Sequence, residues 1–480
     1  MRFLVAGGGV AGLAAAMAVA RAGHSAVVFE RDAVDPEPSP AGAFEVTRRG
    51  IPHFLQPHAF LPRGRRVLRD IAPDVFNDLM GAGGEEQDLS MSLSGPHEPG
   101  DDDLVYLWVR RPVIEWALRR AAEAEPAVEL RSRSHVAGLL TSGKGSDRAV
   151  GVALANGEEV RGDVVVDALG RYRCPPDWPR QVGMSKDCGA VYYSRYYELA
   201  DGVEHLGGGA FNPLNPRGDL GYMGFNTFRG DNRTYAVILL APGPDRELRA
   251  LRHDDAWTAA CSEMRPLDVM TSPDYGRPLT GVMPMGGLMN VDRTRNPSAR
   301  GVVAVGDALC HTDPAFAWGL SFALAHAEAL ARAVSDGPDV DAVVERYQAE
   351  VTPEARERYD LACAMDEARS RRWAGENLEI TRRDGCYPLF SFVTALVAAA
   401  HDDLVLRRTI GRIGLLDRTA VFDEDEELHH RIETTFARVM ATPPPPAGPP
   451  RDELLERLPK SRLTGQVGVE AERGAPAQAS

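Results

Sequence analysis

Residues 3–21 read FLVAGGGVAGLAAAMAVAR, which combines a short apolar strand, a glycine-rich turn and an alanine-rich helix. The glycines of the turn have the spacing G-x-G-x-x-G. A second apolar strand over residues 26–29 ends at an acid, Glu30. Strand, turn, helix, strand and terminal acid together form the fingerprint of a dinucleotide-binding βαβ unit.

The three glycines of this turn have different expected roles. Gly7 permits the tight turn, Gly9 lets the backbone approach a pyrophosphate, and Gly12 lets the helix pack closely against the strand. The helix begins at Val10 and Ala11, and the amides of this first turn are expected to face the phosphates. The turn alone does not distinguish FAD from NAD.

Glu30 narrows the choice of dinucleotide. A carboxylate at this place accepts hydrogen bonds from both hydroxyls of an adenosine ribose, and it repels a 2′-phosphate, so we expect no NADP here. Residues 1–22 also allow a reading as a secretory signal, because Arg2 precedes an apolar run. The complete βαβ pattern that ends at Glu30 favours the nucleotide site.

A second cofactor signal lies far down the chain. Residues 301–305 form a buried-strand pattern that runs directly into Gly306 and Asp307. A loop from Pro314 to Gly319 follows, and apolar residues then recur at intervals of three and four, which predicts a core-facing helix. Either fragment by itself is an ordinary turn or loop.

In this region the chain resembles the flavoprotein monooxygenase family. The resemblance implies that the carboxylate of Asp307 binds the ribityl chain of FAD and that the loop from Pro314 to Gly319 lies along the flavin ring. The helix that continues through Leu320 would point its N-terminus, with about half a positive charge, at the isoalloxazine. Both fragments after the N-terminal fingerprint favour FAD over NAD.

The resemblance extends to further positions around FAD. Arg111, at the start of a helix, would contact the cofactor, and Arg49 would lie near its pyrophosphate. Arg31 and Val136 complete the expected cofactor-binding set. Arg49 and Arg111 each also fit the alternative of a surface salt bridge.

His58 follows a loop, residues 49–52, like one in bacterial secondary-metabolite epoxidases of this family. It is a candidate neighbour of the flavin together with Pro314 and Gly319, although a lone loop histidine is more often structural. His53 is the alternative to His58 at this place. We assign no catalytic residue from the sequence.

Residues 163–171 depart from the family pattern. They form a strand ending in Asp-x-x-Gly-Arg, but Ala168 and Leu169 stand where single-component aromatic hydroxylases carry glycine directly after the aspartate. That motif is linked to NADPH handling in the family. The departure puts direct reduction by NADPH in doubt. The expected electron source is NADPH or NADH, either directly or through a separate flavin reductase.

The pattern along the chain predicts an α/β fold with a discontinuous Rossmann-like FAD-binding domain, residues 1–180 and 291–350. Alternating residues and turns predict an inserted, mainly antiparallel β substrate domain over 181–290. One face of the strand carrying Tyr192, Ser194 and Tyr196, or the opposite face, would line the pocket, with Met283, Met285 and Met289 nearby. We expect a C-terminal helical region over 351–440 and a disordered tail over 441–480.

Composition excludes several classes of partner. The net charge of −15 repels nucleic acid and anionic lipid, so neither is expected as a partner. The longest late apolar stretch, residues 391–400, is too short to cross a bilayer. The six cysteines have no C-x-x-C pair and no zinc-ligand spacing, which favours reduced thiols, no metal and a cytoplasmic location.

The resemblance implies a monooxygenase that inserts one atom of O2 into an apolar small molecule, by hydroxylation or epoxidation, through a flavin C4a-hydroperoxide. Two alternatives on the same scaffold are a reductase of isoprenoid-like double bonds and a non-enzymatic protein that binds a lipid or partner. Halogenation is disfavoured because the chain has no Trp-x-Trp motif, and its three lysines lie outside the region that is catalytic in halogenases.

Overall fold

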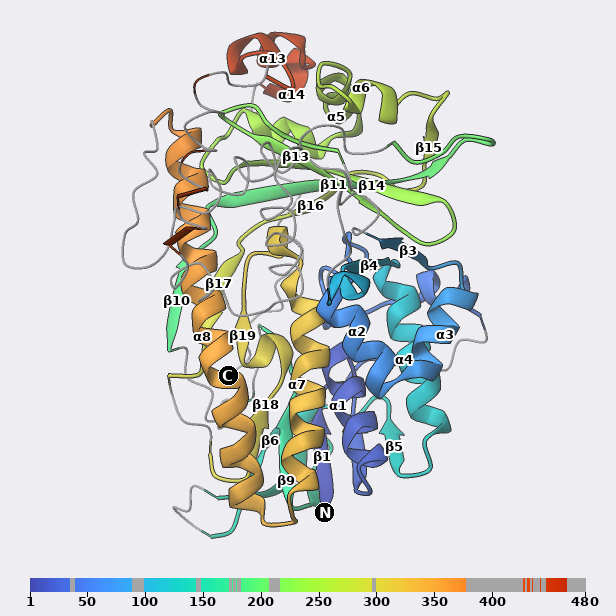
Figure 1. Ribbon diagram of the computed structural model, residues 1–480, viewed down its shortest axis with the longest axis vertical. Coiled ribbons are helices and arrows are strands. Elements are labelled where there is room, and N and C mark those ends of the chain that lie inside the picture. Colours follow the sequence, from blue (N-terminus) through green and yellow to red (C-terminus); the bar gives the residue numbers. More distant parts are fainter. Residues whose placement is uncertain are drawn as a thin grey trace.

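The computed structural model describes residues 1–34, 39–88, 99–143, 148–171, 175, 178, 183–206, 216–295, 299–376, 426, 427, 430, 431, 434, 441 and 446–463. It consists of a parallel sheet with helices against it and a second, antiparallel sheet above (Figure 1). The predicted fold class, a Rossmann-like domain with an inserted antiparallel β unit, is confirmed.

The parallel sheet has five strands, and all of its pairings are parallel. In spatial order these are β18 (Val302–Ala304), β9 (Val164–Asp167), β1 (Arg2–Ala6), β2 (Ser25–Phe29) and β5 (Val128–Arg131). The three central strands are short apolar runs because both faces of the sheet are covered. The chain leaves this sheet after β9 and returns to it only at β18.

Helices cover one face of the parallel sheet, and a small antiparallel sheet covers the other. The helices are α1 (Val10–Arg21), α4 (Arg111–Ala124) and α7 (Trp318–Ser335), with α2 (Pro62–Ile71) and α3 (Pro73–Gly81) beside them. The small sheet is β6 (Val136–Thr141), β7 (Ala149–Leu154) and β8 (Glu159–Arg161). A hairpin of β3 (Glu85–Asp88) and β4 (Val105–Trp108) extends from the helical side.

The second large sheet is antiparallel. It is built from β12 (Arg217–Asp219), β13 (Gly224–Arg229), β14 (Thr234–Pro242), β11 (Ala190–Leu199) and β15 (Gly276–Pro278), with β16 (Met283–Met285) also paired to β11. The structure contains the predicted hairpin as β13 and β14. A three-stranded sheet of β10 (Met184–Asp187), β17 (Met289–Asp292) and β19 (Cys310–His311) connects the two units.

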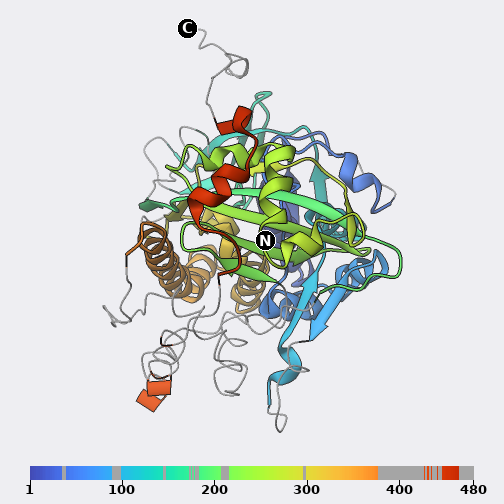
Figure 2. The same ribbon diagram turned by 90° about the horizontal axis from the view of Figure 1, so that it is seen from above.

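Helix α8 (Val340–Trp373) runs alongside both large sheets (Figures 1 and 2). It packs against α7, β17, β18 and β19. The expected boundary at residue 350 therefore falls inside one continuous helix, and no structural break lies at that position. Most of residues 377–440 lie outside the described part of the chain.

The C-terminal segment 446–463 is folded, contrary to the expected tail. Its helices α13 (Arg451–Arg457) and α14 (Lys460–Leu463) lie on the outer side of the second sheet, near α5 (Asp254–Ser262) and α6 (Leu267–Met270) (Figures 1 and 2). Leu454, Leu455 and Leu458 are buried in the core under these helices. Proline-rich composition suggested disorder, but three buried leucines outweigh it. Residues 464–480 lie outside the description.

Replacing Leu454 with alanine tests this packing. The side chain is fully buried, so we expect the free energy of unfolding to fall by about 2–5 kcal/mol. Leu279→Ala is the control, because Leu279 is 41% exposed and its loss should change stability by less than about 0.5 kcal/mol. Chemical denaturation measures both. Equal stabilities of the two variants would contradict the docking of α13.

Two further observations concern the hydropathy of the helices and the state of the cysteines. None of the helices in the described ranges has the length and apolar character needed to cross a membrane. Four cysteines, Cys188, Cys261, Cys310 and Cys363, are buried free thiols. Cys174 and Cys386 lie outside the described residues.

Candidate functional site

The candidate site lies at the carboxyl edge of the parallel sheet. Gly7 follows β1, Glu30 follows β2, Asp167 ends β9 and Gly306 lies just past β18. Parallel strands place their carboxyl ends at one edge, so these four positions come together although they are far apart in sequence. Ligands of open α/β sheets bind at such an edge.

The glycines of the first turn differ in how much room surrounds them. Gly7 has φ +111°, and a Cβ there would lie 2.3 Å from the carbonyl oxygen of Ala168. A Cβ on Gly12 would lie 1.9 Å from the carbonyl oxygen of Gly7. For Gly9 the nearest described atom, Cδ1 of Ile51, is 3.7 Å away. The chain itself therefore requires Gly7 and Gly12, whereas a Cβ on Gly9 would make only an ordinary van der Waals contact with Ile51.

Glu30 is buried and already organised by its neighbours. Its carboxylate accepts hydrogen bonds from the backbone amides of Gly8 (3.0 Å) and Asp32 (2.8 Å). Arg48 donates to the same carboxylate at 2.9 Å. Arg31 is half-buried, and its guanidinium lies over Gly50. The acid is thus fixed at the end of β2, where an adenosine ribose would lie.

Arg48 is a residue that the sequence analysis missed. It is buried and forms ion pairs with Glu30, Asp32 and Glu115. Arg49, which we expected at the pyrophosphate, is exposed. Single-sequence reasoning gave no signal that separates two adjacent arginines, because their burial depends on acids from two distant segments, the end of β2 and α4.

Asp307 lies between the starts of two helices. Gly306 has φ +58°, and a Cβ there would lie 2.9 Å from that of Ala11, so the turn after β18 rests on the first turn of α1. A Cβ on Gly319, at the start of α7, would lie 3.7 Å from Oδ1 of Asp307. Burial would raise the pKa of Asp307, but nearby His311, and then further His and Arg groups, lower it well below its usual range.

His58 is held as a neutral ring. Its Nδ1 lies 2.6 Å from the carbonyl oxygen of Gln56, and Nη1 of Arg111 lies 3.3 Å from its Nε2. This pattern assigns the proton to Nδ1. Burial, and then the charge of Arg111, lower the pKa of His58 to about 3. His58 is therefore an uncharged hydrogen-bonding group at neutral pH.

One ring stack and a series of polar contacts connect His58 with Asp307. The rings of His58 and His53 stack with centroids 5.8 Å apart. Arg171 reaches Nδ1 of His53 at 3.4 Å and Nε2 of His311 at 2.9 Å, and Nδ1 of His311 lies 3.4 Å from Asp307. The structure thus joins both loop histidines with the arginine of the Asp-x-x-Gly-Arg segment. His311 is a second residue that the sequence analysis missed.

The remaining candidates are placed as follows. Arg111 begins α4 and donates to Glu115 at 2.8 Å. Val136 is buried beneath the strand that ends at Glu30. The loop of Pro314 is a short 3-10 helix, η6 (Pro314–Phe316), which is followed by Ala317 with φ +55°. Gly319 is exposed, and Leu320, Val10 and Ala11 lie in the first turns of α7 and α1.

The second sheet turns one face toward this edge. Tyr192 donates to Asp313, and the hydroxyl of Ser194 lies 2.5 Å from Oε1 of Gln56. Tyr193 and Tyr197 lie on the opposite face, in the core beneath α5. We call the side with Tyr192, Ser194 and Tyr196 the inner face of β11. Met283 and Met285 pair with it in β16 and are half-buried, and Met289 lies in β17.

The residues at the carboxyl edge fit a bound dinucleotide. Gly9, which has room for a Cβ, directly precedes α1, Glu30 follows the second strand, and Asp307 lies beside the start of α7. Helix N-termini favour anions and a terminal acid suits ribose hydroxyls. The sequence-predicted positions Gly9, Glu30 and Asp307 are therefore brought to one edge.

The chain shares its fold with solved structures of FAD-dependent monooxygenases and related flavoproteins. No protein-family model and no curated protein matches the chain. PqsL, described as a probable FAD-dependent monooxygenase from Pseudomonas aeruginosa, is 17% identical with a TM-score of 0.57, over 78% of this chain and 98% of that one. Flavin-dependent brominase Bmp2 is 16% identical, with a TM-score of 0.59, over 92% and 98%.

A flavoprotein/dehydrogenase from Cytophaga hutchinsonii is also similar, with 15% identity and a TM-score of 0.62 over 92% of this chain and 99% of that one. The TM-scores establish that the fold is shared, and at identities this low the similarity shows the fold alone. They do not decide among oxygenation, halogenation and dehydrogenation, because one scaffold hosts several chemistries.

Proposed function

We propose that the protein is an FAD-dependent monooxygenase that inserts one oxygen atom from O2 into an apolar small molecule. The observation that carries the proposal is the carboxyl edge of the parallel sheet. There Gly9, which has room for a Cβ, lies at one edge with the acids Glu30 and Asp307, and the inner face of β11 reaches the loop of Gln56 through Ser194.

The proposed roles of the residues follow from their places. The α1 amides after Gly9 bind the pyrophosphate, Glu30 the adenosine ribose and Asp307 the ribityl chain. When bound, FAD supplies the electrons and the oxygen chemistry. The N-terminus of α7 stabilises negative charge on the reduced ring, and the inner face of β11 covers the site and limits water. Arg49, Arg111, Arg31 and Val136 remain proposed neighbours of FAD.

For the electron source we propose NADPH or NADH, used directly or through a separate flavin reductase. Asp167, the acid of the altered Asp-x-x-Gly-Arg segment, is 2% exposed. It accepts hydrogen bonds from the indole of Trp178 (3.0 Å) and the amide of Leu169 (3.1 Å). Because internal donors already engage this carboxylate, its placement supports the reductase route.

Oxygenation is favoured over halogenation by the positions of the lysines. Lys186 is exposed on β10, where it pairs with Glu367. Lys460 is exposed at the start of α14, beyond the second sheet. Lys144 lies outside the described residues. The two described lysines are thus away from the carboxyl edge. Hydroxylation or epoxidation, in a bacterial secondary-metabolite context, is the finer proposal.

One experiment tests the reaction class. Purified protein with FAD and a reductant is supplied with 18O2 and a panel of apolar polyketide, terpenoid and aromatic compounds. A product heavier by one 18O atom supports the proposal. Saturation of a double bond without oxygen supports the reductase alternative. A protein that binds no flavin supports the non-enzymatic alternative.

Asp307→Asn tests the FAD assignment directly. The carboxylate is ionised at neutral pH because its pKa is lowered, so the substitution removes a charged acceptor. A charge-assisted hydrogen bond contributes about 1.5–3 kcal/mol, and we expect the Kd for FAD to rise by roughly tenfold or more. Asp336→Asn, at an exposed acid, is the control. Fluorescence titration measures both, and equal affinities would remove Asp307 from the site.

A further inference from the structure

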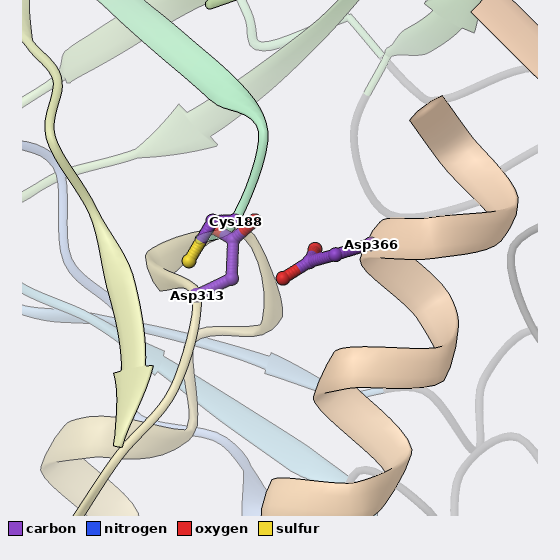
Figure 3. Close-up of side chains that lie close together, drawn as sticks. All are labelled: Cys188, Asp313 and Asp366. Carbon is purple, nitrogen blue, oxygen red and sulfur yellow. The ribbon is translucent and has the colours of Figure 1, made fainter. Parts of the chain in front are cut away.

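A buried cluster of ionisable groups lies next to the loop of Pro314. Figure 3 shows Cys188, Asp313 and Asp366, whose sulfur and carboxylate oxygen atoms come within 4.8 Å of one another. Cys188 precedes β11, Asp313 directly precedes Pro314, and Asp366 lies on α8. Both carboxyl groups are at most 2% exposed. The proposed reaction assigns no role to these groups.

The cation of this cluster is an arginine. Nη2 of Arg369 lies 2.8 Å from Asp313, 2.9 Å from Asp366 and 2.6 Å from the carbonyl oxygen of Cys188. Its guanidinium takes the place that a metal ion would need between the two acids. One positive charge therefore faces two buried carboxyl groups.

Two carboxylates this close, with one cation, cannot both ionise without a large cost, so one of them keeps a proton. Asp313 accepts hydrogen bonds from the hydroxyl of Tyr192, the amide of Ala315 and Arg369, and three donors favour its ionised form. Asp366 accepts from the amide group of Asn290 at 2.7 Å. The second oxygen, Oδ1, lies 2.9 Å from Nη2 of Arg369, but within the described residues it accepts no hydrogen bond, because Nη2 donates to Asp313 and to the carbonyl oxygen of Cys188. The proton therefore belongs to Asp366.

We propose that Arg369, Tyr192 and protonated Asp366 are positioning residues that hold ionised Asp313 and thereby fix the loop from Pro314 to Gly319. The carboxylate of Asp313 caps η6 through the amide of Ala315 (2.9 Å), and its backbone amide donates to Asn290 (2.7 Å). This loop leads into α7, whose start lies beside Asp307. The inference rests on the proposed function where it concerns flavin.

The titration of the pair agrees with this arrangement. Burial and the charge of Asp313 raise the pKa of Asp366 to about 8. Burial opposes ionisation of Asp313 as well, but Arg369 and the other donors keep its pKa below the usual value. The ionisable groups that face Asp366 are Asp313 beside η6, Arg369 and Cys363 on α8, Cys188 before β11 and Tyr192 on β11.

The sign of the pH effect on stability follows. An unfolded aspartate titrates near pH 4, whereas folded Asp366 titrates near 8, so the folded state binds more protons between these values. Stability is lost progressively as the pH rises from about 4 to about 8. Above pH 8 Asp366 is also ionised, and its negative charge repels that of Asp313 next to the loop of Pro314.

The test compares two isosteric substitutions in the full-length protein. Asp366→Asn mimics the protonated acid, so its Tm should match that of the wild type at pH 4 and exceed it at pH 8. Asp313→Asn leaves Arg369 without its ionised partner and should lower Tm by roughly 5 °C at both pH values. Asp360→Asn, an exposed acid on the same helix, is the control. Equal losses for the first two variants would overturn the assignment of the proton.

A flavin readout separates positioning from simple stability. In wild-type protein loaded with FAD, the visible flavin spectrum and the Kd for FAD should change with a midpoint near pH 8. That pH-dependent change should vanish in Asp366→Asn. Arg369→Met should weaken the binding of FAD, and Arg369→Lys should recover part of the lost affinity. A change that persists in Asp366→Asn overturns the proposal, as does a stoichiometric metal in the purified protein. If no FAD binds, the proposed function fails, whereas the Tm comparison still tests the network.

Discussion

Replacement of Arg48 by alanine is expected to lower the free energy of unfolding by about 3–5 kcal/mol, the range seen when one partner of a buried ion pair is removed. The guanidinium is 3% exposed and lies among three carboxylates, those of Glu30, Asp32 and Glu115. Without it, three buried acids face one another, and their other ion pairs within the described residues, Arg111 with Glu115 and Arg31 with Asp32, do not link the three carboxylates.

Arg49→Ala is the matched control because the two arginines are adjacent. Arg49 is exposed, so its loss should change stability by less than about 0.5 kcal/mol. Urea unfolding of the apo proteins measures both values. A small effect at Arg48 would mean that its acids are not buried together. FAD affinity of Arg49→Ala then tests separately whether this side chain contacts the pyrophosphate.

The second large effect is expected at the glycine turn, where two Gly→Ala substitutions should separate folding from binding. Gly12→Ala places Cβ 1.9 Å from a backbone oxygen, so we expect a loss of at least about 4 kcal/mol or no soluble protein. Gly9→Ala has 3.7 Å of clearance and should fold normally. It should nevertheless raise the Kd for FAD by about tenfold or more, because Cβ fills the space for the pyrophosphate.

Gly281→Ala is the control for Gly9→Ala, since it has the same 3.7 Å clearance at an exposed position far from the carboxyl edge. Circular dichroism and thermal melting report folding, and flavin titration reports binding. Gly9→Ala with normal FAD affinity would show that no phosphate approaches this amide. Such a result would weaken the whole assignment of the carboxyl edge.

The nucleotide half of the fold could be predicted from sequence because its signals are local. A strand, glycine turn and helix are contiguous in residues 3–21, and Gly7 and Gly12 are required by backbone atoms of the same turn or of the adjacent strand end. The helix expected after Gly319 follows in the same way from apolar spacing, although α7 already begins at Trp318. Period-two alternation also gave the two faces of β11, though not which face turns inward.

The rest depends on contacts between distant segments. Arg48 and Arg49 are indistinguishable in sequence, and only the meeting of β2, its following loop and α4 buries one of them. Asp313 and Arg369 are 56 residues apart, and no periodicity indicates that they pair. The prediction of a disordered tail was wrong for a different reason. Proline-rich composition indicates disorder, but the three leucines at and after α13 have helical spacing and are buried.

The alternation along β11 has a consequence for how this scaffold acquires new substrates. Side chains on the outer face, such as Tyr193 and Tyr197, belong to the core beneath α5, so their replacement unfolds the sheet. Inner-face positions such as Ser194 contact the first unit instead. Selection, in nature or in a mutant library, can therefore vary inner-face positions such as Ser194 while the outer face, together with Tyr192 at Asp313, preserves the protein.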